Sequence, residues 1–138
     1  MDMHVRLNQL AQDLGMQELL LDAHGACGLA FGHGLQIGLH YNKDDDALHL
    51  AGMLGLIDSA AAPALMHTLL DGNNDLAVLG EGHFAIDRTH HEVVLCRTLV
   101  AHELRASPLS REVNRLVEAC GHWRDELAQR GLIRLTTG

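Results

Sequence analysis

The chain has 138 residues and a formal net charge of −8 with its 11 histidines uncharged. This length suits a single domain with an apolar core, and we take residues 1–138 as one domain. The acidic balance argues against nucleic acid or anionic lipid as partners, because both are bound through grouped Lys and Arg side chains. The sequence contains no apolar run long enough for a membrane span and no segment that resembles a secretory signal.

The N-terminal segment predicts an amphipathic helix over residues 2–14, with Asp2 as a candidate N-cap and Gly15 just past its end. Its apolar residues recur at helical spacing: Met3, Leu7, Leu10 and Leu14. Residues 18–23 then suggest a short strand that leads into a tight turn at His24-Gly25.

Residues 26–54 predict a three-stranded meander. Apolar side chains alternate with small or polar ones over residues 27–31, 35–41 and 48–50, and the turns between these runs are rich in Gly or Asp. Period-two alternation broken by such turns is typical of antiparallel strands with one buried face.

The second half of the chain predicts a short helix, a hairpin and a long helix. Ser59 is a candidate N-cap, Pro63 suits the first turn, and Gly72-Asn73-Asn74 would end the short helix. Residues 83–87 and 92–97 form the hairpin, and Ser107-Pro108 starts a helix that stops at Gly131. The tail over residues 132–138 is expected to fray or to pack as an extended segment. We therefore predict an α+β fold, with an antiparallel sheet of about five strands flanked by these three helices.

The residues that carry chemistry form no recognisable catalytic or metal motif. The serines fall at helix starts, and HExxH, CxxC, GxSxG and EF-hand patterns are missing from the sequence. The three cysteines, Cys27, Cys96 and Cys120, lie in apolar periodic settings and are interpreted as core thiols of a reducing cytosol. We expect no enzymatic activity, no metal and no cofactor.

Several stretches in succession resemble the class I chaperones of type III secretion, the Tir chaperone family. They are LAQDLGMQELLLDAHGACGLAF, LQIGLHYNKDDDALHLAGMLG, the short Ala/Leu-rich helix, FAIDRTHHEVVLCRTL and the long last helix. The resemblance spans roughly residues 3 to 130 and lies in the order and lengths of the elements, in the helix end at residues 10–15, and in small size and acidity. The excess of histidine departs from it.

The resemblance implies a homodimeric bacterial protein of the cytoplasm that holds the N-terminal segment of a secreted effector in extended form. Such a segment can add to a sheet edge through backbone hydrogen bonds and place alternate side chains in grooves. The candidate effector-binding residues are Leu7, Leu10, Leu14, Leu29, Phe31, Leu39 and Tyr41. The candidate dimer contacts are Met53, Leu65, Met66 and Leu69. Two other classes stay open: a non-enzymatic α+β adaptor for a folded partner, and a histidine-dependent metal protein.

Overall fold

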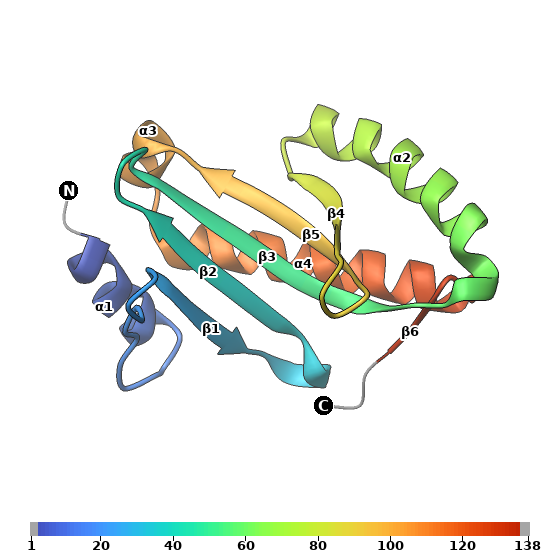
Figure 1. The fold of residues 1–138 in the computed structure, drawn as a ribbon. Coiled ribbons are helices and arrows are strands. Elements are labelled where there is room, and N and C mark those ends of the chain that lie inside the picture. Colours follow the sequence, from blue (N-terminus) through green and yellow to red (C-terminus); the bar gives the residue numbers. More distant parts are fainter. Residues whose placement is uncertain (1–2, 136–138) are drawn as a thin grey trace.

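A computed structural model describes residues 3–135, which form four α-helices and six strands (Figure 1). The helices are α1 (Met3–Asp13), α2 (Ala62–Leu79), α3 (Ala101–Ala106) and α4 (Leu109–Gln129). The strands are β1 (Ala26–Ala30), β2 (Gln36–Asn42), β3 (Ala47–Ile57), β4 (His83–Asp87), β5 (Glu92–Leu99) and β6 (Ile133–Arg134). The α+β class and the order of helix, meander, helix, hairpin and long helix are confirmed.

The strands form one antiparallel sheet in the order β1-β2-β3-β5-β4, with the short β6 paired to the far end of β3. The predicted meander is therefore real: Leu29 of β1 lies opposite Ile37 of β2, and Leu39 of β2 lies opposite Leu50 of β3. Since side chains alternate between the faces of a strand, this register puts the apolar residues of all three strands on one face.

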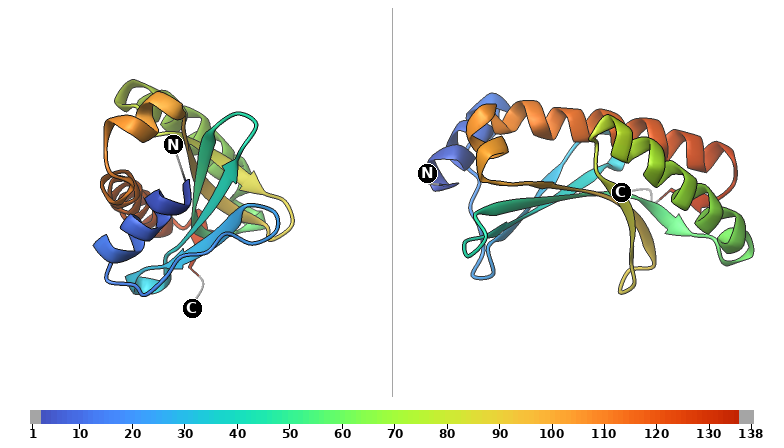
Figure 2. Two further views of the ribbon diagram at one scale, coloured as in Figure 1. Left: turned by 90° about the vertical axis from the view of Figure 1, so that its left-hand side faces the viewer. Right: turned by 90° about the horizontal axis from the view of Figure 1, so that it is seen from above.

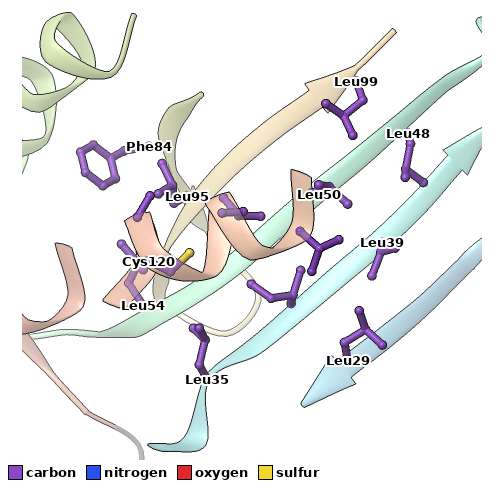
Figure 3. Packing of buried hydrophobic residues seen from close by; sticks show 14 of the residues in the cluster. Leu29, Leu35, Leu39, Leu48, Leu50, Leu54, Phe84, Leu95, Leu99 and Cys120 are labelled. Carbon is purple, nitrogen blue, oxygen red and sulfur yellow. The ribbon is translucent and has the colours of Figure 1, made fainter. Parts of the chain in front are cut away.

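The helices gather on that apolar face, the inner face, while the described part of the chain leaves the outer face without a helix (Figure 2). α4 runs along the inner face and packs against β3. Gly52 of β3 makes this approach possible, because a side chain there would overlap Sγ of Cys120 on α4. Cys120 thus lies among the leucines of the sheet at the centre of the core (Figure 3).

Two elements are longer than predicted, and both contain residues that usually interrupt them. The middle helix α2 continues past Gly72 and Asn73 to Leu79. Gly72 allows the helix to lie close to Phe84, and Asn73 Oδ1 accepts a 2.6 Å hydrogen bond from the Phe84 backbone N–H. Likewise β3 extends to Ile57 through two glycines that admit α4 and β6. In both elements these residues allow close packing against other elements and do not end the helix or the strand.

Other differences concern short segments and caps. The strand suggested for residues 18–23 does not form; this segment is irregular, and the turn at Gly25 (φ 81°) leads directly into β1. The short helix α3 was not predicted, whereas β6 fits the expectation of an extended tail. Asp58, not Ser59, caps the turn before α2, and Ser107 Oγ donates to Glu112 Oε1 (2.9 Å) instead of capping α4. The expected cap at Asp2 and the tail beyond residue 135 lie outside the described residues.

Candidate interaction surfaces

The residues proposed for effector binding lie on or next to α1, β1 and β2, but they are not all neighbours, since Phe31 follows the last residue of β1 and Tyr41 pairs with Gly25 just before its first. They also differ in exposure. Leu7, Leu10, Leu29 and Leu39 are buried in the apolar core, whereas Leu14, Phe31 and Tyr41 are only partly buried. The Tyr41 hydroxyl donates to Asp46 Oδ1 at 2.7 Å, and this hydrogen bond raises the pKa of Tyr41. The partly buried three are the members of this set that a partner can reach without opening the core.

The free edge of β1 carries unpaired backbone groups. Hydrogen bonds from Phe31 N to Leu35 O and from Tyr41 N to Gly25 O fix which residues of β1 point toward β2. By the alternation of an antiparallel ladder, the N–H and C=O groups of Ala26, Gly28 and Ala30 point the other way.

Asp22 occupies one part of this edge. Its Oδ1 accepts from the N–H of Ala26 (3.0 Å) and of His24 (2.8 Å), and its own N–H donates to Ala26 O (2.8 Å). These backbone hydrogen bonds lower the pKa of Asp22, that from Ala26 most. Gly28 and Ala30 are exposed, and within the described residues their outward N–H and C=O groups have no hydrogen-bond partner. We call these two residues the β1 edge.

Apolar surface lies close to the β1 edge. A pocket of about 340 Å³ is bounded by both of its residues, by Gly38 on β2 and by Met53 on β3. Large apolar side chains are also exposed on α1 and on the segment that follows it: Val5, Met16 and Leu20. The sequence pattern did not single out these three, because the helical stripe of residues 2–14 contains only Met3, Leu7, Leu10 and Leu14. Met53, proposed from the sequence as a dimer contact, also lines the edge pocket.

The middle helix α2 has one buried face and two exposed flanks. Of its predicted dimer contacts, Leu65 and Leu69 are buried against the sheet, and Met66 is exposed. Leu70 follows Met66 by one helical turn and is 70% exposed, so the two residues form one flank, which we call the Met66 flank. Leu79, nine residues after Leu70, lies half a turn around the helix and is also exposed, and the exposed Val78 lies between the two, about 80° around the helix from Leu70.

The titratable groups do not form a reactive centre within the described residues. Burial raises the pKa of Cys27 and of Cys96, and raises the pKa of Cys120 to about 12, so these thiols stay protonated and are poor nucleophiles. His40 and His49 face each other across β2 and β3 with ring centroids 6.0 Å apart, and His49 Nδ1 lies 2.9 Å from Thr98 Oγ1. In residues 3–135 no three His, Cys, Asp or Glu side chains are grouped so that they could hold a metal ion.

None of the helices in the described range is long and apolar enough to cross a membrane.

Comparison with solved structures finds the same fold in three protein complexes. The chain is similar to a chain of the ExsC–ExsE complex, with 18% identity, a TM-score of 0.79, and coverage of 97% of this chain and 96% of that one. It is also similar to a chain of the HopA1–SchA chaperone–effector complex, with 22% identity, a TM-score of 0.72, and coverage of 91% and 98%. A third match is to the heterodimeric ExoU–SpcU complex of the type III secretion system of Pseudomonas aeruginosa, with 18% identity, a TM-score of 0.64, and coverage of 90% and 96%.

The sequence itself has a family match. A search of curated protein sequences found no significant relative. However, the sequence model of the Tir chaperone protein (CesT) family matches residues 6–124, which is most of the chain, from the middle of α1 into α4. The chain therefore belongs to the Tir chaperone protein (CesT) family.

Proposed function

We propose that this protein is a homodimeric, non-enzymatic chaperone of the bacterial cytoplasm. It binds the N-terminal region of a type III secreted effector in extended form and keeps that region soluble and competent for secretion. The family match supports this function, and two of the similar structures are named as a chaperone–effector complex and as a type III secretion complex.

The observation that carries the proposal is the open β1 edge. A partner strand placed beside Gly28 and Ala30 would pair with four backbone groups that are otherwise unpaired, and each such hydrogen bond contributes about 0.5–1.5 kcal/mol. The opposite sheet edge is less available, because Asn73 already accepts the outward N–H of Phe84 on β4. Backbone pairing tolerates many partner sequences, so affinity for one effector must come from the side chains nearby.

Apolar surface beside the edge supplies that second contribution. The pocket next to Met53 lies on one side, and Phe31 and Tyr41 offer partly buried apolar surface just beyond the two ends of β1. The side chains of an extended partner segment alternate between the two faces of its strand, so one set can contact each of these apolar surfaces. The buried leucines of the predicted site support this surface from beneath.

Dimer formation is assigned to the Met66 flank of α2. Met66 and the 70% exposed Leu70 form an apolar strip, and Met66 also borders a pocket of about 380 Å³ with Ile57 and Ile86. Exposed apolar strips of this kind are typical of surfaces that another chain covers.

Replacing Ala30 by proline tests the edge most selectively. Proline removes the outward N–H and blocks a partner strand, but it breaks no bond between β1 and β2 and is tolerated on edge strands. We expect the variant to fold, judged by circular dichroism and thermal unfolding, and to bind the effector's N-terminal segment about tenfold or more weakly in calorimetry.

The matched control is Ala30→Ser, which keeps the backbone N–H and a small side chain. It should bind as the unchanged protein does. If Ala30→Pro also binds with unchanged affinity while folded, partner segments do not pair with β1 and the proposed mode of binding fails.

A further inference from the structure

A second hollow lies near β4, at the sheet edge opposite β1, between the C-terminal half of α2 and one face of α4. It measures about 750 Å³, more than twice the pocket beside the β1 edge. One wall is formed by Asp75, Leu76, Val78 and Leu79 of α2 and by Glu81. The other is formed by residues of α4 that recur at helical spacing from Arg115 to Trp123. We call it the α2–α4 groove. The effector-binding residues above do not line it.

The floor of the groove is apolar and held by packing. Leu76 and Ala119 are buried, and the ring of Trp123 stands edge-on against Phe84 with centroids 5.0 Å apart. Gly72 fixes this arrangement, because a Cβ there would come within 2.7 Å of Phe84 and 3.3 Å of Trp123. The floor of the groove is therefore already packed in the chain without a partner.

The last two residues of α2 form the lip of the groove and expose apolar side chains. Val78 is 87% exposed and Leu79 is 62% exposed. The helix stops at Gly80 (φ 67°), where the N–H groups of Gly80 and Glu81 donate to the carbonyls of Ala77 and Leu76. A glycine in the left-handed backbone conformation is a common C-terminal cap of helices, so the backbone at the end of α2 has one defined conformation.

The rim of the groove is acidic. Asp75, Glu81 and Glu118 border it, and none of their carboxylates has an ion-pair partner within the described residues. The one guanidinium on the rim, that of Arg115, already lies 3.8 Å from Glu112 Oε2. His122 also lines the groove, so its lining presents to a ligand three carboxylates, one guanidinium shared with Glu112 and one imidazole.

An apolar floor with an acidic rim selects its occupant by charge. A second copy of this chain would bring the same carboxylates toward one another in a two-fold contact, which is unfavourable. Nucleic acid and anionic lipid are repelled for the same reason. A partner segment with apolar side chains flanked by Lys or Arg satisfies both features, as amphipathic helices do in apolar grooves.

We propose that the α2–α4 groove is a second binding site, which takes an amphipathic, basic segment of another protein. Because the elements that form the groove lie beside β4, at the sheet edge opposite β1 (Figure 1), the chain can hold an effector segment and this second partner at once. The site goes beyond the proposed function and does not depend on it.

Trp123 makes the site directly observable, because it is the only tryptophan of the chain and lies in the groove floor. The full chain is titrated with an amidated helical peptide of leucine and lysine, whose leucines recur at i, i+3, i+4 and i+7. We expect a saturable shift of tryptophan emission that weakens as salt is added. The same peptide with glutamate in place of lysine should cause no shift.

Two charge-reversal variants distinguish peptide binding in the groove from general electrostatic attraction of a basic peptide to an acidic protein. Glu118→Lys changes the groove rim and should weaken peptide binding about tenfold, whereas Asp45→Lys, in the exposed turn between β2 and β3, should leave it unchanged. The proposal is overturned if both variants weaken binding equally, if the glutamate peptide binds as well, or if no shift occurs. It is also overturned if tryptophan emission changes with protein concentration alone, since a second copy would then fill the groove.

Discussion

Glycine decides how closely the layers of this molecule approach. Gly52 leaves room for Cys120 at the centre of the core, and Gly72 leaves room for Phe84 and Trp123 under α2. Both residues stand inside regular elements, where glycine costs conformational entropy that alanine would not. Close packing of helix against sheet compensates for that cost.

Replacing Gly72 by alanine should lower the free energy of unfolding by about 1–2 kcal/mol, because a Cβ placed 2.7 Å from the Phe84 ring overpacks this contact by more than helix propensity regains. Denaturant unfolding measures the change. The control is Gly121→Ala on α4, where a Cβ would meet no atom within 4 Å. That variant should gain up to about 1 kcal/mol; equal effects of the two substitutions would show that packing at Gly72 is not the cause.

The spacing of apolar residues along the sequence was sufficient to predict the main helices and the meander. The apolar alternation of residues 27–41 and the helical stripe of Leu7 and Leu10 each have one buried face, so one pattern fixes both type and orientation. The length of α2 was not predictable in this way, because Gly72 and Asn73 are local helix breakers whose role depends on Phe84, a residue on a later strand.

The binding surfaces were harder to predict than the fold, for a related reason. An apolar residue in a periodic pattern is either core or contact surface, and only the neighbouring elements decide which. Two adjacent residues of α2 illustrate this, since Leu65 is buried against the sheet whereas Met66 is exposed. The open groups of the β1 edge carry no sequence signal at all, since they belong to the backbone of Gly28 and Ala30.

The Met66 flank of α2 yields a prediction about assembly. Leu70→Asp places a charge on this flank and should give a folded monomer, seen by sedimentation and circular dichroism, because a buried unpaired charge at a dimer contact is costly. Leu79→Asp, half a turn around the helix from Leu70, should stay dimeric, and Leu69→Asp in the core should unfold. A Leu70→Asp protein that remains dimeric would rule out this flank as the contact.

Across the whole molecule, the surfaces described above lie on different elements of one scaffold. α1 and β1 form the end with the open edge, while α2 stands at the other end with its two exposed flanks (Figure 1). The net charge of −8 opposes aggregation through the exposed apolar side chains and favours basic partner segments. An effector segment that follows this scaffold needs no folded structure of its own.

Limited proteolysis of the complex that the tagged chain forms in its own cells, with mass spectrometry of the protected fragments, tests the proposed function as a whole. The account predicts one dominant secreted partner, protected over a segment near its N-terminus that is digested when the chaperone is absent. Protection of the partner only as a folded domain, with its N-terminal segment cleaved as readily as in the free protein, would contradict it and favour an adaptor that shares this fold.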